Sequence, residues 1–466
     1  MLSSVTYEYD SAHHILAYGN LICNTIFFIL YSRFFGTKLL EPATWYLFFH
    51  YALFAFRPAV LFSLGYHGNY SYMGIHPAVS DSAITFFVTN VALLSFLLGC
   101  GLRGSHPLQR TSETASPLEI QTFFIAAIFF APLYAYSIYY GLSNPIVETN
   151  ATSSGNVMID PETGKKIFVS GSGYLYVLKN CFPGLIIAHI ILFRVNVWNL
   201  SAAIAFLAMT FLEGRGRFII IYFVLGLIIY YFQRPNVSRA KKAILLLFFS
   251  ALSLILISVG GLYRRVTRSL GEVSWSDFNI VDFVARTPMG DSQEFGMFEF
   301  LSYIIKFYPD ENFGYSFFTQ YLEVFTKPIP RALWPGKPVG SPIQLVDLDY
   351  FGNFQGLTQS MPGAGWLSLG LLGVVVLAFF SGFALQSAYC YAAKRWDDMS
   401  IRSIYIVSLP LCIQWFRDGA PSIVEFYAFG LYPLIFWVAL IRLARGKYLP
   451  TINRDLRLKL RGREAR

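Results

Sequence analysis

Long apolar stretches, separated by shorter polar segments, recur along most of the chain. About eleven of them have the length, roughly 17–25 residues, that a helix needs to cross the hydrocarbon core of a bilayer. They lie at about 13–33, 43–65, 83–102, 119–141, 173–194, 197–213, 217–233, 242–262, 364–391, 402–416 and 422–443. The pattern predicts an all-α, polytopic integral membrane protein with about eleven transmembrane helices, in a range of roughly ten to fourteen.

One long segment interrupts this series because it is not continuously apolar. The chain therefore divides into four parts: an N-terminal transmembrane bundle of about eight helices, a long loop that carries short helices, C-terminal transmembrane helices and a basic tail. These parts span residues 1–262, 263–363, 364–443 and 444–466.

Composition supports a membrane protein and excludes a disordered one. Charged residues make up 14% of the chain and hydrophobic residues 55%, whereas soluble proteins carry about 25% charged residues. The net charge of +9 could by itself indicate a nucleic-acid partner. However, 442–466 contains nine basic and two acidic residues, which account for most of this excess. We therefore expect anionic membrane lipid, and no nucleic acid, as the partner of these charges.

The distribution of Lys and Arg predicts the orientation of the helices. The loop 234–242, the region 394–402 and the tail 442–466 are basic, whereas 66–82 contains no Lys or Arg. Basic loops stay in the cytoplasm, so eleven spans place the N-terminus outside and the C-terminus inside. The long segment 263–363 then faces outward.

Two arginines follow each other on this outward face, where the orientation rule disfavours them. Arg215 and Arg217 lie in Glu213–Arg217, a tight turn between two very hydrophobic spans, with glycines that permit it. Guanidinium groups at a membrane boundary favour an anion such as a diphosphate or carboxylate. The alternative is a structural turn whose arginines reach toward lipid phosphates.

Two further arginines could also have either a ligand-binding or a structural role. Arg57 lies in the middle of a span, and Pro58 is expected to break the helix there. An arginine at this depth contacts either a ligand anion or a carboxylate on another helix. Arg417 and Asp418 precede a glycine where the tenth span meets the outside. They form either part of a ligand site or a pair of solvated charges at a helix end.

The long outward segment contains a rigid, proline-rich stretch. Four prolines lie within 328–338 and hold Arg331 and Lys337 at fixed positions. Trp334 between them is either an interfacial anchor or a platform for a sugar ring. Upstream, apolar residues at helical spacing predict an amphipathic helix over 295–308 that lies on the membrane.

Other residue types carry little functional signal. The five cysteines all lie in apolar stretches without metal-ligand spacing, which is typical of small buried side chains. Asp347 and Asp349 form a D-x-D pair, but acidic residues are frequent in this segment and we expect no metal site there. No nucleotide-binding P-loop is present, so chemistry driven by ATP is unsupported.

The arginine motifs together resemble those of the bacterial oligosaccharide repeat-unit polymerases, also called O-antigen polymerases. The stretch from Pro330 to Pro338 is similar to the family's PR-x-x-W-P-x-K-P signature. The turn at Glu213–Arg217 resembles its mid-chain arginine motif, and Arg417-Asp418-Gly419 its third arginine region. The resemblance covers the order of spans along essentially the whole chain and implies a membrane glycosyltransferase architecture of the GT-C type.

The resemblance implies a polymerase in the bacterial inner membrane with its active site on the periplasmic side. Such enzymes transfer a growing glycan from undecaprenyl diphosphate to the non-reducing end of a new lipid-linked repeat unit. Arg215, Arg217 and Arg331 are then expected to stabilise the charge on the leaving diphosphate. A carboxylate, Asp291 or Glu294, is expected to act as general base. The expected substrate-binding residues are Arg57, Trp334, Lys337, Arg417 and Asp418.

Further expectations follow from the resemblance. No metal or cofactor is expected, and the partners are a chain-length regulator and a lipid-glycan flippase. Two other functions remain open at this point. An O-antigen ligase shares the architecture but carries a histidine in the large outward loop, and 263–363 has none. A flippase or transporter often has internal repeats and charges at the membrane midplane, and we find no repeat here.

Overall fold

The computed structural model describes most of the helical part of the chain. The described residues are 7–36, 38–107, 115–143, 156–159, 166–169, 180–212, 217–233, 295–309, 314–322, 334, 359–419 and 423–464, with single positions at 238, 240 and 244. Within them the regular secondary structure is helical, apart from a short antiparallel ribbon of β1 (Asn156–Ile159) and β2 (Lys166–Val169).

Seven helical segments in these ranges are long and apolar enough to cross a membrane. Four precede the long segment: α1 (Ser11–Phe34), the continuous span Pro42–Ser63, α5 (Val79–Arg103) and α6 (Pro117–Ser143). Three follow it: α16 (Ser360–Ala393), α17 (Met399–Asp418) and α18 (Phe429–Glu464). The chain is thus an α-helical membrane protein, as its apolar pattern predicts.

Three shorter apolar helices lie between these two groups: α8 (Cys181–Phe193), α9 (Val197–Leu212) and α10 (Arg217–Gln233). Every predicted span except 242–262 therefore overlaps a described helix, and 173–194 does so only over α8. Most of the span 242–262 and of the long loop 263–363 lies outside the described residues. The total number of membrane crossings accordingly stays a prediction.

The bundle is built around the close contact of α5 with α16. Gly99 on α5 and Gly382 on α16 permit this contact. A methyl group on Gly99 would overlap the carbonyl oxygen of Phe379, and one on Gly382 would overlap that of Phe96. Around this pair α17 is mostly buried and contacts α2, α8, α10 and α18, whereas α1 is mostly exposed. The exposed apolar face of α1 is suited to contact lipid.

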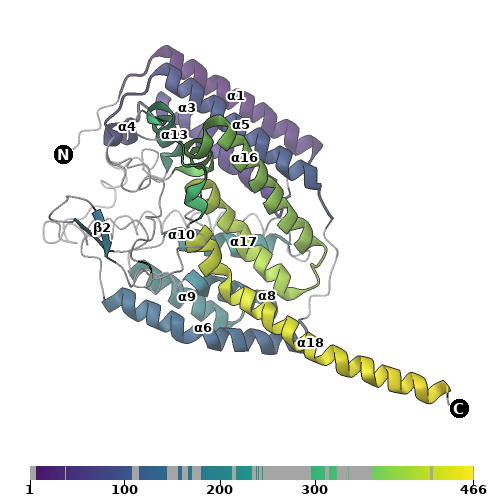
Figure 1. Ribbon diagram of the computed structural model, residues 1–466. Helices are drawn as coiled ribbons and strands as arrows, with labels where there is room; N and C mark the ends of the chain where they lie inside the picture. Colours follow the sequence, from purple (N-terminus) through teal and green to yellow (C-terminus); the bar gives the residue numbers. More distant parts are fainter. Residues whose placement is uncertain are drawn as a thin grey trace.

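The helices run back and forth between two ends of the bundle, as Figure 1 shows. We call the end that carries residues 7–10, 64–78, 295–309 and 314–322 the loop face. At this face Tyr7 N donates to Gly65 O at 3.0 Å. The opposite end carries residues 35–41, 103–107 and 394–398, and we call it the tail face. From there α18 continues as one helix through the basic tail and projects from the bundle (Figure 1).

The prediction that Pro58 breaks its helix is wrong. The span Pro42–Ser63 combines α2 (Pro42–His50), a π-helical turn η1 (Tyr51–Phe56) and α3 (Arg57–Ser63) without interruption. Arg57 N donates to Ala52 O, five residues back. A wider π-turn ahead of a proline relieves the clash of the ring with the preceding turn, so the helix continues.

The helix predicted over 295–308 exists as α13 (Met297–Phe307), but its predicted place on the membrane surface is wrong. All residues from Met297 to Ile304 are buried. The helix packs against α5, α16 and the short α4 (Gly68–Met73). A helix buried on every side is part of a protein core.

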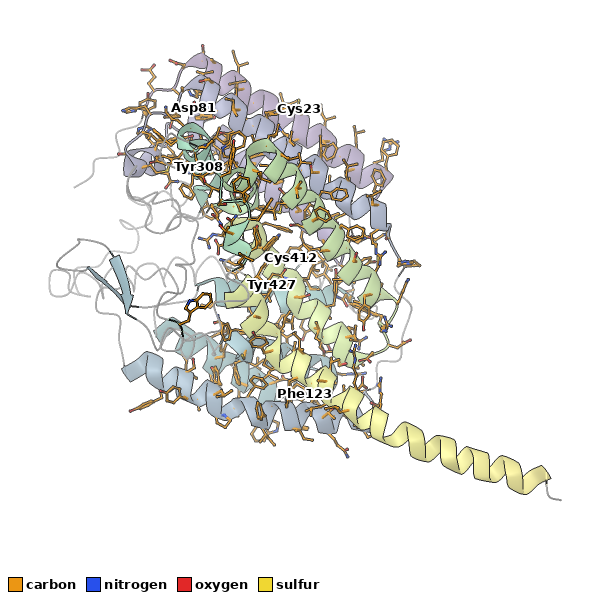
Figure 2. The ribbon with its side chains drawn as sticks, viewed as in Figure 1. Cys23, Asp81, Phe123, Tyr308, Cys412 and Tyr427 are labelled. Carbon is orange, nitrogen blue, oxygen red and sulfur yellow. The ribbon has the colours of Figure 1, made fainter. Side chains whose placement is uncertain are left out.

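The cysteines follow their prediction with one exception. Cys100, Cys181, Cys390 and Cys412 are buried, and all five are free thiols. Cys23 is exposed on the outer helix α1, while Cys412 lies within the bundle (Figure 2).

Candidate functional site

A buried ion pair joins the second span to α13 near the loop face. Arg57 is 5% exposed and its Nη2 lies 2.6 Å from Glu299 Oε1, with Glu299 itself fully buried. Asn69 Nδ2 on α4 donates to the same oxygen at 3.0 Å. Charges at this depth persist when they are paired and hydrogen-bonded. The anion next to Arg57 is thus a protein carboxylate, the structural alternative that the sequence leaves open.

The sequence did not identify Glu299 as the partner of Arg57. Glu299 is one of several carboxylates in the long segment, and it differs from them by lying within the apolar helical run of α13. A single acidic residue in such a run was the available signal. Its second oxygen, Oε2, is buried and has no hydrogen-bond partner among the described residues.

The Tyr66 ring lies near this ion pair, and the next residue, His67, belongs to a cluster of stacked rings. The Arg57 guanidinium lies 5.8 Å from the centre of the Tyr66 ring. The His67 ring stacks with Tyr7 at 4.3 Å and with His76 at 5.3 Å. Burial, and then the neighbouring His76, lower the pKa of His67, which favours the neutral ring at neutral pH. This cluster holds the loop between the second span and α5 against the N-terminal residues.

The long segment also docks on α16, where that helix is interrupted at Leu369–Gly370. Ser316 N donates to Leu367 O at 2.9 Å, and Phe317 N donates to Ser368 O at 3.0 Å. These bonds use carbonyl groups that the break makes available. The described parts of the segment are thereby fixed on the helical bundle.

The motif Arg417-Asp418-Gly419 lies where the long segment re-enters the bundle. Gln359 Nε2 donates to Asp418 O at 3.2 Å. Gly419 has a φ of +70°, and an added Cβ would come within 3.1 Å of both Ala364 Cβ and Gln359 Nε2. Glycine therefore fits both the backbone conformation and the space at this position.

The two charges of this motif are partly accessible. Arg417 Nε lies 3.7 Å from Asp418 Oδ1, and the two side chains are 20% and 18% exposed. The pair therefore lies at the edge of the protein on the loop face, neither fully buried nor fully solvated. This setting is compatible with contact to a ligand anion, because both side chains can be reached from outside the protein.

The other predicted site residues are only in part described. Arg217 begins α10, which packs against α17; its side chain is not described. Tyr222 Oη on α10 and Val407 on α17 both lie close to Gly184 on α8. Farther along, Tyr230 Oη on α10 donates to Ile190 O on α8, so α10 runs in the direction of α8. The start of α17 lies by the end of α8, because Met399 and Trp437 both bond to Glu119, and Phe123 contacts both Trp437 and His189. The start of α10 and the end of α17 therefore belong to the same face. Trp334 is 39% exposed.

Five predicted site residues lie outside the described part of the chain: Arg215, Asp291, Glu294, Arg331 and Lys337. The structure thus brings Arg417, Asp418 and the first residue of α10 to one face, and places Arg57 in the core. Whether the arginines share one cavity stays a prediction. Within the described ranges, no three His, Cys, Asp or Glu side chains gather in a way that would hold a metal ion.

Comparison with known proteins adds no relative to this picture. No family model, no curated protein and no solved structure matches the chain. Its fold class follows from its own apolar helices: it is an α-helical membrane protein.

Proposed function

We propose that the chain polymerises oligosaccharide repeat units carried on undecaprenyl diphosphate. The observation that supports this most is the position of Arg417-Asp418-Gly419. The motif packs against Gln359, at the point where the long segment returns to the bundle. It shares the loop face with the start of α10, which follows Arg215 by two residues in the sequence. An anion at this face would meet arginines from distant parts of the chain.

In the proposed reaction a hydroxyl oxygen of the new repeat unit attacks the anomeric carbon of the growing glycan. The bond between that carbon and the diphosphate oxygen breaks, and the leaving diphosphate takes the electron pair. Arg215, Arg217, Arg331 and Arg417 would stabilise the charge that develops on it. A carboxylate, Asp291 or Glu294, would accept the proton of the attacking hydroxyl.

The remaining residues would bind and position the substrate. Lys337 and Trp334 are proposed to contact phosphate and sugar, with Asp418 orienting Arg417. Arg57 would act indirectly, because its ion pair with Glu299 fixes α13 at the start of the described long segment. This role differs from the direct substrate contact that the resemblance implies.

The proposal assigns a compartment to each face of the bundle. The loop face would face the periplasm and the tail face the cytoplasm of a bacterial inner membrane. A flippase would supply lipid-linked units to the loop face, and a chain-length regulator would limit the polymer. The architecture would be that of a membrane glycosyltransferase of the GT-C type.

The test uses a strain from which the gene is deleted and to which variants are returned on a plasmid. With Arg417→Lys we expect single repeat units in place of long-chain ladders on a polysaccharide gel, because an ammonium group lacks the bidentate fork. Arg215→Ala and Arg331→Ala should give the same result. The matched control is Arg103→Ala, an exposed arginine on the tail face, which should retain the ladder.

Protein levels in the membrane, measured through a C-terminal tag, separate loss of activity from loss of folding. Full-length ladders from the Arg417, Arg215 and Arg331 variants at normal levels would remove these arginines from the site. The ligase alternative has its own signature. If deletion leaves long polymer attached to the lipid carrier and absent from lipid A, the chain is a ligase and not a polymerase.

A further inference from the structure

A second group of arginines lies at the opposite end of the bundle and has no part in the proposed reaction. On the tail face a cavity of about 120 Å³ opens between the end of α16, the start of α17 and α18. Three arginines line it, Arg395, Arg442 and Arg445. The apolar side chains of Ile401 and Ile441 also line it, so the cavity has a cationic part and an apolar part.

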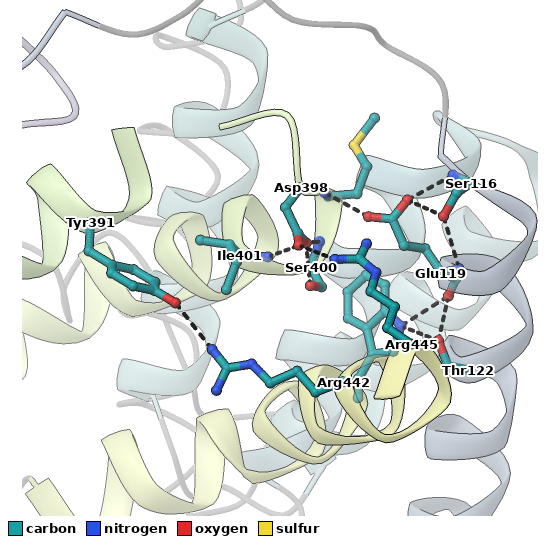
Figure 3. A network of polar contacts seen from close by, with 11 residues as sticks. Ser116, Glu119, Thr122, Tyr391, Asp398, Ser400, Ile401, Arg442 and Arg445 are labelled. Carbon is teal, nitrogen blue, oxygen red and sulfur yellow. Dashed lines mark hydrogen bonds and ion pairs between the residues drawn. The ribbon is translucent and has the colours of Figure 1, made fainter. Parts of the chain in front are cut away.

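Two of these arginines contact a neutral side chain. The Arg395 guanidinium lies 4.2 Å from the centre of the Tyr391 ring, and Arg442 Nη2 donates to Tyr391 Oη at 3.1 Å (Figure 3). Within the part of the chain that the structure describes, neither arginine forms an ion pair with a carboxylate. A guanidinium has five N–H donors, so these contacts leave donors available for an anion.

The cavity contains one carboxylate, and it is already engaged. Asp398 Oδ1 accepts hydrogen bonds from Ser400 N at 3.0 Å and Ile401 N at 3.3 Å, which caps the start of α17. Its Oδ2 lies 3.6 Å from Arg445 Nη1. Asp398 thus balances one positive charge, and the charges of Arg395 and Arg442 have no acidic counterpart in the lining.

Two walls of the cavity, α17 and α18, are held to α6 by hydrogen bonds that do not involve these arginines. Met399 N donates to Glu119 Oε1 at 3.0 Å, which ties α17 to α6. Trp437 Nε1 donates to Glu119 O at 2.9 Å, which ties α18 to the same helix (Figure 3). A substitution of Arg395 or Arg442 therefore removes charge from the cavity, together with its own contact to Tyr391, and leaves these two hydrogen bonds to α6 in place.

We propose that this cavity binds the phosphate of an anionic phospholipid headgroup. Arginine forks match the oxygens of a phosphate, and the tyrosine between them holds both in place. The cavity lies at the ends of helices that are apolar along a membrane-spanning length, which is the level of lipid headgroups. Its apolar part suits the acyl chains or glycerol that adjoin the phosphate. A soluble phosphate compound offers the same chemistry to the arginines, so the test separates the two sources.

The test uses the full-length protein in a neutral detergent and the double variant Arg395→Gln/Arg442→Gln. Phosphatidylglycerol, phosphatidylcholine or inorganic phosphate is added, bound lipid is detected by native mass spectrometry, and thermal unfolding is followed. We expect the double variant to bind phosphatidylglycerol roughly tenfold more weakly, because each basic group at this level adds to the attraction. Arg103→Gln, on the same face and outside the cavity lining, is the matched control and should bind normally.

Each other result overturns part of the proposal. Equal binding of phosphatidylglycerol by the double variant and the unmodified protein would show that the cavity is not the site. Binding of phosphatidylcholine as tight as that of phosphatidylglycerol would remove the role of headgroup charge. If inorganic phosphate alone stabilises the protein through these arginines, and phosphatidylglycerol does not, the site takes a soluble phosphate and the lipid assignment is wrong.

Discussion

The partners of single charged residues were the hardest part of this protein to predict. An arginine inside an apolar stretch predicts that an anion is present, and Arg57 meets that expectation. Its partner Glu299 lies 242 residues further along the chain. No local pattern encodes such a contact, because pairing at this separation depends on how the helices pack. Spacing and composition single out the three arginine motifs as candidates, and neither predicts the distances between them.

The pairing of Arg57 with Glu299 makes a prediction for stability. Arg57→Met leaves a buried carboxylate without its cation and should destabilise the protein by about 3–5 kcal/mol. The double variant Arg57→Met/Glu299→Met removes both charges and should recover much of this loss. Thermal unfolding of the detergent-solubilised protein measures both, and losses that simply add in the double variant would contradict a direct interaction.

Helices were predicted well wherever an apolar run was long, because burial in lipid or protein requires a satisfied backbone. The local geometry and the surroundings of these helices were harder to predict from the sequence. A proline in mid-span predicted a break, but a π-turn ahead of Pro58 accommodates it. The apolar spacing in α13 predicts a surface helix, because the sequence does not reveal that α13 packs against α5 and α16.

The contact of α5 with α16 makes a prediction that two glycines on one helix can test. Gly99→Ala forces a methyl group against the backbone of α16 and should destabilise the protein by about 1–3 kcal/mol. Gly101→Ala, two residues along, has nothing within 4 Å and should be neutral or slightly stabilising. Thermal unfolding midpoints compare the two, and an equal shift for both would contradict this account of the contact.

At the scale of the whole molecule, the alternation of the spans predicted two faces that differ in charge and loop length. The structure has two such faces, with the basic helix α18 leaving from one and the described parts of the long segment gathered on the other (Figure 1). The side of the membrane that each face occupies remains a prediction from the distribution of Lys and Arg. The order of apolar and polar segments in the sequence predicts which loops lie at the same end of the bundle. It does not predict the contacts that these loops make with one another.

The predicted orientation can be tested in intact bacterial cells with a maleimide that does not cross the membrane. The background carries Cys23→Ser, because Cys23 is the exposed native cysteine. Ser71→Cys on the loop face should react from outside, and Asp397→Cys on the tail face should react only after the inner membrane is opened. The opposite pattern of labelling would invert the proposed topology.

The distance in sequence between Arg57 and Glu299 also affects how the protein is made. Ribosomes add about 5–20 residues per second, so the 242 residues between them take roughly 12–50 s to synthesise. During this time the second span has left the ribosome while its carboxylate partner does not yet exist. An arginine in an isolated span costs up to about 2.5–3.5 kcal/mol on translocon scales, the value for the helix centre. This span is therefore expected to be retained beside the translocon, or shielded by earlier helices, until α13 emerges and completes the pair.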